Sequence, residues 1–258
     1  MSDPDALRAH AVAAARLSVA PFSGRPAGAA VRLQDGRWAA APRVENSAFP
    51  TTIPALAGAV AVGLVAGGAP VAAAHSQPLT ASDLAFLADA TGRPWRLVAP
   101  DVAVADGAEA PADAGPVSLR VDAPADDAAG LVAAVEAARS AVVPASAFPV
   151  GAVAVDAAGR AVRGANVEYE ADWTRGLCAE RVALVAACAA GLGPAVRIWV
   201  ACTKAPGGSP CGACRQVLSD LAPDAAVVLW NGDSAPVETT VAALLPGAFR
   251  GEGIGPTA

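Results

Sequence analysis

The chain has 258 residues, and 54% of them are hydrophobic, which is enough apolar material for two small cores. Its formal net charge of −6 argues against a nucleic acid polymer as substrate or partner, because phosphate binding requires a basic surface. A small neutral substrate is therefore expected.

The first predicted elements are a helix over Leu7–Val19 and a β-hairpin block over Pro21–Glu45. No charged residue occurs from Ile53 to Ala74, a length that a membrane-spanning helix would need. Pro54 and Pro70 restrict an unbroken helix to a segment shorter than the roughly 20 residues of a span. We therefore expect a buried helix and no membrane partner.

A polar run rich in Ala, Asp, Pro and Gly follows, and it predicts a linker without a core element over residues 107–126. Beyond it the chain repeats itself. A shift of 123 residues aligns Pro21–Glu45 with Pro144–Glu168 without a gap. Nine of the 25 aligned residues are identical: Pro21, Ser23, Pro26, Gly28, Ala29, Gly36, Arg37, Val44 and Glu45. We expect two tandem domains, residues 1–106 and 127–258.

The second copy predicts alternating helices and strands. They are a helix over Leu131–Val142, a hairpin of Gly151–Val155 and Ala161–Val167, a helix over Cys178–Ala190, a strand over Arg197–Cys202, a helix from Cys211 and a strand over Ala225–Trp230. Such alternation favours an α/β fold with helices on both faces of a sheet.

The chemistry is indicated by Cys178-Ala179-Glu180 and, 33 residues after Cys178 (211 − 178), by Cys211 and Cys214 of a Pro-Cys-x-x-Cys motif. A zinc ligand, any residue, Glu, and later Pro-Cys-x-x-Cys is the signature of zinc-dependent deaminases. Three protein ligands leave the fourth position of catalytic zinc for water. The hypothesis is therefore one Zn²⁺ held by three thiolates, with Glu180 moving protons from water to the substrate.

Both ligand motifs lie at predicted helix starts, where the partial positive charge of the helix stabilises thiolates. Three thiolates around Zn²⁺ leave one excess negative charge. Arg181 and Arg215 are placed by the sequence to offset that charge by hydrogen bonding to sulfur.

Two other interpretations of the cysteines are weaker. A structural zinc site usually has four protein ligands, and the only histidines, His10 and His75, belong to the first copy. A Cys-x-x-Cys redox pair would leave Cys178-Ala179-Glu180 unexplained. The chain has five cysteines, an odd number, and begins without a basic and apolar leader, so we expect a reducing, cytoplasmic compartment.

The first copy has lost this chemistry. Pro54-Ala55-Leu56 aligns with Cys178-Ala179-Glu180, and Pro78–Ser82 aligns with Pro210–Cys214. Proline and leucine cannot bind zinc, so this copy is predicted to be metal-free. We expect it to cover apolar surface of the second copy.

The second copy resembles the cytidine deaminase family over nearly all of Leu131–Phe249. The resemblance is carried by Phe148–Ala152, Asn166–Glu168, Cys178–Arg181, Pro210–Gln216 and Leu244–Phe249. It implies three-layer α/β/α domains and hydrolytic deamination of cytidine or deoxycytidine in pyrimidine salvage. It also implies that two such tandem chains form a homodimer that mimics a tetramer of domains.

The same resemblance implies that Asn166 and Glu168 bind the ribose hydroxyl, Phe148 packs against the base, and the backbone around Ala179 reads the pyrimidine. The segment from Glu168 to Cys178 is one residue longer than in the common short members of the family. Two alternatives stay open: deamination of a modified cytosine nucleoside or nucleoside antibiotic, and a non-catalytic relative that binds zinc or nucleoside.

Overall fold

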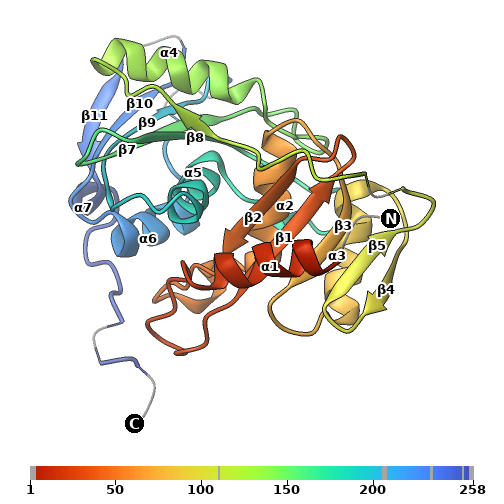
Figure 1. Ribbon diagram of the computed structural model, residues 1–258. Helices are drawn as coiled ribbons and strands as arrows, with labels where there is room; N and C mark the ends of the chain where they lie inside the picture. The colour runs from red at the N-terminus through yellow and green to blue at the C-terminus, as the bar shows by residue number, and fades with distance from the viewer. Residues whose placement is uncertain (1–3, 110, 205–207, 233–234, 252, 256–258) are drawn as a thin grey trace.

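The computed structural model describes residues 4–109, 111–204, 208–232, 235–251 and 253–255. Ala110 of the predicted linker, and a few positions of each predicted domain, lie outside these ranges. The described chain forms two sheets (Figure 1). The sheet of the first copy is antiparallel, and the second sheet is mixed because it contains a parallel strand pair.

The first sheet has the strand order β2-β1-β3-β5-β4. Its strands are β1 (Gly28–Leu33), β2 (Trp38–Pro42), β3 (Pro70–His75), β4 (Trp95–Ala99) and β5 (Val102–Ala105). The associated helices are α1 (Pro4–Ala15), the short 3-10 helix η1 (Phe49–Thr51), α2 (Ala55–Val65) and α3 (Ala81–Thr91). Alternate strand residues pack against α1 on one face and α2 on the other.

The second sheet has the order β11-β10-β9-β7-β8-β6. Its strands are β6 (Arg120–Val121), β7 (Gly151–Asp156), β8 (Ala161–Ala165), β9 (Ala195–Ala201), β10 (Ala226–Trp230) and β11 (Val237–Thr240). The helices are α4 (Asp127–Ala138), the 3-10 helix η2 (Trp173–Arg175), α5 (Ala179–Ala189), α6 (Gly212–Leu221) and α7 (Val241–Leu244). Helix α4 covers one face, and α5 and α6 cover the other (Figure 1). This arrangement confirms two α/β/α copies.

The repeated residues have repeated structural roles. A Cβ atom at Gly28 would lie 2.2 Å from the Ala11 carbonyl oxygen, and one at Gly151 would lie 1.9 Å from that of Ala134. Glycine at this position therefore lets the first helix of each copy contact its sheet. Gly36 and Gly159 adopt left-handed φ angles of +87° and +73° in the hairpin turns, where glycine is favoured.

Three expectations were wrong in detail. The leading helices end at Ala15 and Ala138, because Val19 and Val142 instead form bridges with Val44 and Val167. The predicted linker contains β6, which pairs with β8, and its Leu119 side chain is 4% exposed within the main core.

In the first copy, β5 lies antiparallel to β3. At the corresponding place in the second copy, β10 lies parallel to β9. A two-residue connection, Pro100-Asp101, makes β4 and β5 a hairpin, which allows only antiparallel pairing. The first copy therefore ends in two strands where the second copy has β10 after α6.

The uncharged segment contains the buried helix α2 and most of β3. Helix α2 packs against α5 of the other copy. A Cβ atom at Gly58 would lie 3.0 Å from a Val185 methyl carbon. The two copies therefore share one continuous core cluster. Within the described residues, no helix is long and apolar enough to cross a membrane.

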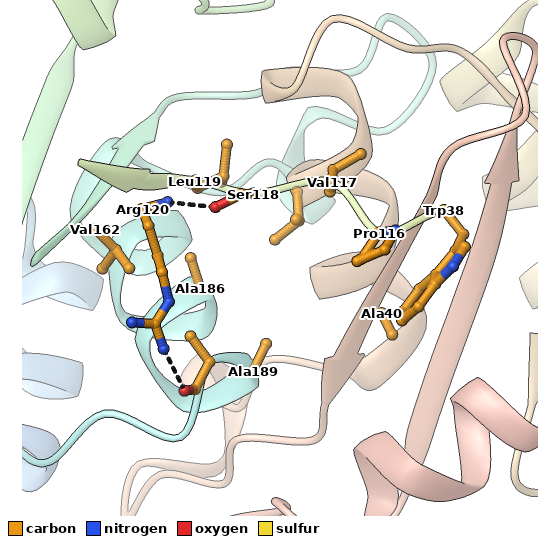
Figure 2. Close-up of a pocket in the computed structure, with 12 residues that line it drawn as sticks. Trp38, Ala40, Pro116, Val117, Ser118, Leu119, Arg120, Val162, Ala186 and Ala189 are labelled. Carbon is orange, nitrogen blue, oxygen red and sulfur yellow. Dashed lines mark hydrogen bonds between the residues drawn. The ribbon is translucent and has the colours of Figure 1, made fainter. Parts of the chain in front are cut away.

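The linker also lines a cavity of about 320 Å³ between the copies (Figure 2). Trp38 and Ala40 line it from β2, and Arg120 lines it from β6, where its guanidinium donates to the Ala190 carbonyl oxygen at 3.2 Å. The cavity lies beside the C-terminal end of α5, at the opposite end of that helix from Cys178.

Deleting residues 1–106 should give aggregated or inactive protein, because the deletion removes α2 and exposes the apolar side of α5. Size-exclusion chromatography and an activity assay check this outcome against the full-length chain. A soluble, fully active fragment would contradict it.

Candidate active site

Helices α5 and α6 bring the three predicted ligand cysteines together. Cys178 is the N-cap residue of α5 and Cys211 is the N-cap residue of α6, while Cys214 lies in the first turn of α6. The sulfur atoms of Cys178 and Cys211 are 3.6 Å apart, as are those of Cys211 and Cys214. All three sulfur atoms lie within 4.8 Å of one another.

The sulfur geometry fits zinc. A tetrahedral ion bound about 2.3 Å from each sulfur places the sulfur atoms about 3.8 Å apart. In the described part of the chain, the group that could hold a metal contains these three cysteines and no fourth His, Cys, Asp or Glu. The donor set is therefore that of a site with one open coordination position.

At this site, ionisation of one thiol is favoured and ionisation of the next is opposed. Contact with Cys178 is the largest cause that lowers the pKa of Cys211, and contact with Cys211 raises the pKa of Cys178. Contacts with both of the other thiols raise the pKa of Cys214. A divalent cation relieves this conflict, because it stabilises several thiolates at once.

Glu180 is the one carboxylate on the first turn of α5, and its side chain is 4% exposed. Burial is the largest cause that raises the pKa of Glu180, and negative charge at Cys211 raises it further. A raised pKa brings the pH at which a carboxyl group gains and loses its proton nearer to neutral.

Close packing sets the position of α5. A Cβ atom at Gly164 in β8 would lie 2.4 Å from both the Ala179 carbonyl oxygen and the Ala183 nitrogen. Because glycine lacks this atom, the start of α5, with Ala179 fully buried, lies directly on the sheet. The site helix is thus supported by the core.

Arg181 and Arg215 bind the backbone beside the cysteines. Arg181 donates to the Gly176 carbonyl oxygen at 2.5 Å, and its Nε is buried without a hydrogen-bond partner among the described residues. Arg215 donates to the Pro210 carbonyl oxygen at 2.7 Å and to that of Leu244 at 3.0 Å. Their predicted hydrogen bonds to sulfur stay a prediction.

The predicted substrate residues lie on one loop and the strand end beside it. The Asn166 amide accepts from the Val150 N–H at 2.8 Å and donates to the Phe148 carbonyl oxygen at 2.9 Å. Glu168 accepts from the Ser146 N–H at 3.0 Å and from its hydroxyl at 2.5 Å. Both side chains therefore hold the loop that carries Phe148.

Two further residues shape this loop and were missed from the sequence. Ser146 binds Glu168 just as Ser23 binds Glu45 in the first copy, so the repeat itself contained the signal. Lys204 donates to the carbonyl oxygen of Ala147, at 2.5 Å, where Ala147 has a left-handed φ of +50°. No sequence pattern pointed to that contact.

The first copy keeps a cavity of about 370 Å³ at the corresponding place. Its lining includes Ser23, Arg43, Glu45 and Pro54, and none of the chain's five cysteines occurs before residue 178. One alignment detail changes: α3 begins after Thr80, which corresponds to Cys211, because Thr80 and Asp83 form a capping box. The Pro78–Ser82 alignment is therefore shifted by one residue.

Two family models, each described as the cytidine and deoxycytidylate deaminase zinc-binding region, match residues 124–230 and residues 1–78. The cytidine deaminase of Halalkalibacterium halodurans is 46% identical over 121 residues, covering 46% of this chain and 90% of the relative. That of Sporosarcina psychrophila is 40% identical over 118 residues, covering 45% and 86%.

A solved cytidine deaminase structure from Burkholderia pseudomallei is 41% identical, covering 47% of this chain and 98% of that chain with a TM-score of 0.45. One from Mycobacterium tuberculosis is 34% identical, covering 45% and 90% with a TM-score of 0.38. The sequence relatives and the two family models show that this chain belongs to the cytidine deaminase family, as a tandem member.

Replacing Arg181 with Gln should lower zinc retention or turnover by about 10- to 100-fold, the usual cost of losing a residue that supports metal ligands. The reason is loss of the Gly176 hydrogen bond and of the nearby positive charge. Zinc titration and steady-state kinetics measure both effects.

Arg163→Gln is the matched control, because that arginine donates to the hydroxyl of Ser140, just after α4, which covers the sheet face opposite α5. Unchanged zinc retention and turnover in Arg181→Gln would refute the role.

Proposed function

We propose that this chain hydrolyses cytidine or deoxycytidine to the corresponding uridine nucleoside, and that it serves pyrimidine salvage. The observation that carries the proposal is the cluster of Cys178, Cys211 and Cys214 beside buried Glu180. The two sequence relatives named above are both called cytidine deaminase, which supports the substrate class.

We assign one Zn²⁺ per chain to the three cysteines of the second copy. When bound, zinc supplies a Lewis acid that activates water. Glu180 would accept a proton from the attacking water as the water oxygen bonds to the ring carbon, and would return protons to the ring nitrogen and the amino group, so that the C–N bond breaks and ammonia leaves. Its burial beside the cluster supports this role, and the raised pKa of its carboxyl group makes the carboxylate a stronger base toward water.

The substrate residues are assigned to the loop and helix around the cluster. Phe148 packs against the base, the backbone at Ala179 reads the pyrimidine, and Asn166 and Glu168 face the sugar. The hydrogen bonds that Asn166 and Glu168 make with the Phe148 loop support a pocket in which sugar and base contacts are coupled. Arg181 and Arg215 support the ligand loops.

The assembly is proposed on the same basis. Residues 1–106 form a metal-free domain, 107–126 connect the copies, and 127–258 form the catalytic domain. Two chains pair as a homodimer with four domains in total. Trp173 (75%) and Phe249 (55%) have exposed side chains, and we propose that the partner chain covers them. The free thiols support a reducing compartment such as the cytoplasm.

The deciding experiment follows the ultraviolet absorbance of cytosine nucleosides across a substrate panel. Cytidine and deoxycytidine should lose the cytosine chromophore fastest. Faster loss with a modified cytosine nucleoside or a nucleoside antibiotic would favour that alternative, and binding without any absorbance loss would favour a non-catalytic relative.

Replacing Glu180 with Gln should lower kcat by at least about 100-fold, because the group that moves the protons is removed. Zinc content should stay unchanged, since Glu180 is not among the predicted ligands. Glu136→Gln on the exposed side of α4 is the control and should match the parent. Near-normal turnover in the Glu180 variant would remove this residue from the mechanism.

A further inference from the structure

The segment between Glu168 and Cys178 connects the predicted sugar-binding residue to a predicted zinc ligand. It is also the segment with one extra residue. Helices η1 and η2 lie 124 residues apart (173 − 49), whereas Glu45 and Glu168 lie 123 apart (168 − 45). The extra residue therefore falls between Glu168 and η2, where the chain leaves the sheet.

The first copy holds this segment through Asp89 of α3. One carboxylate oxygen of Asp89 accepts from the Ala171 N–H and the other accepts from the Asp172 N–H, both at 3.0 Å. A charged acceptor makes these hydrogen bonds stronger than neutral ones. Asp89 thus fixes two consecutive backbone groups just before η2.

Helix α3 contacts the same segment on both sides of that point. The Phe86 ring meets the Tyr169 ring edge-on at 5.0 Å, and Tyr169 is 2% exposed. Arg175 donates to the Ser82 hydroxyl at 2.6 Å, and its guanidinium carbon lies 5.5 Å from the Phe86 ring centre. The segment is therefore anchored to the metal-free copy at three positions.

The opposite half of the interface repeats the aspartate contact. Asp220 of α6 accepts from the Ser47 N–H at 2.6 Å and from its hydroxyl at 3.1 Å. Asp89 and Asp220 each lie nine residues after the N-cap of their helix (89 − 80 and 220 − 211). Ser47 and Ala171 are likewise 124 residues apart (171 − 47). The copies therefore exchange equivalent contacts, as subunits do across a two-fold axis.

Only one of the two exchanged segments leads to the cysteine cluster. We infer that Asp89 is a positioning residue for substrate binding: by fixing Ala171 and Asp172 it sets the distance between Glu168 and the cluster. The metal-free copy thereby acts on the affinity for the nucleoside. The inference rests on the proposed function, because that affinity is measured with cytidine.

The test compares Asp89→Ala with Asp220→Ala in the full-length, zinc-loaded chain. Each variant removes both acceptor oxygens at the same helix position, and alanine favours the helix. Asp89→Ala should raise KM for cytidine about tenfold and change kcat by less than about twofold. Asp220→Ala should lose a similar amount of thermal stability but leave KM within about twofold of the parent.

Hydrogen exchange gives a readout that does not depend on turnover. Amides 169–177 should exchange faster in Asp89→Ala and at the parent rate in Asp220→Ala. Asp89→Asn keeps one acceptor oxygen and should raise KM less than Asp89→Ala does. It replaces the alanine variant in the test if that variant folds poorly.

Equal KM changes in the two alanine variants, or unchanged exchange over residues 169–177 in Asp89→Ala, would overturn the inference. So would an unchanged KM in Asp89→Asn together with faster exchange. A parent chain that does not deaminate cytidine would instead refute the proposed function, and hydrogen exchange would still decide whether Asp89 holds the segment.

Discussion

Three thiols at the beginnings of two helices are the constraint on which the second copy depends. The sulfur atoms are close enough that ionising one opposes ionising the next. A bound cation would relieve this opposition, and the packing of the second copy holds the first turns of α5 and α6 side by side at this point. Gly164 lets α5 lie on the sheet, and the parallel β9–β10 crossover places the start of α6 beside it.

The first copy shows what remains when that constraint is released. Pro54 and Thr80 begin α2 and α3 where Cys178 and Cys211 begin α5 and α6. Helix α2 carries no ligand residue and is an apolar helix packed against α5, and the final strands of this copy form a hairpin. The serine and glutamate that hold the sugar-side loop are nevertheless kept as Ser23 and Glu45. The serine–glutamate contact is therefore common to both copies, whereas the cysteine cluster occurs in the second.

Much of this could be predicted because the signals were local. Cysteines at helix starts, glycines in hairpin turns and an uncharged core helix each depend on nearby residues. The β4–β5 hairpin turns locally at Pro100-Asp101, and that signal was overlooked. Strand β6 was missed because its pairing with β8 joins segments that are distant in sequence. The Asp89 contact was missed for the same reason: a lone aspartate on α3 gives no sign that its partners are amides 82 and 83 residues later.

The central claim is an ion held by three sulfur atoms with one position left for a lighter atom. X-ray absorption at the zinc edge, combined with elemental analysis of the purified chain, tests it directly. The account predicts one zinc per chain, with three sulfur neighbours at about 2.3 Å and one oxygen or nitrogen neighbour. Four sulfur neighbours, or a chain purified without metal under non-oxidising conditions, would contradict it.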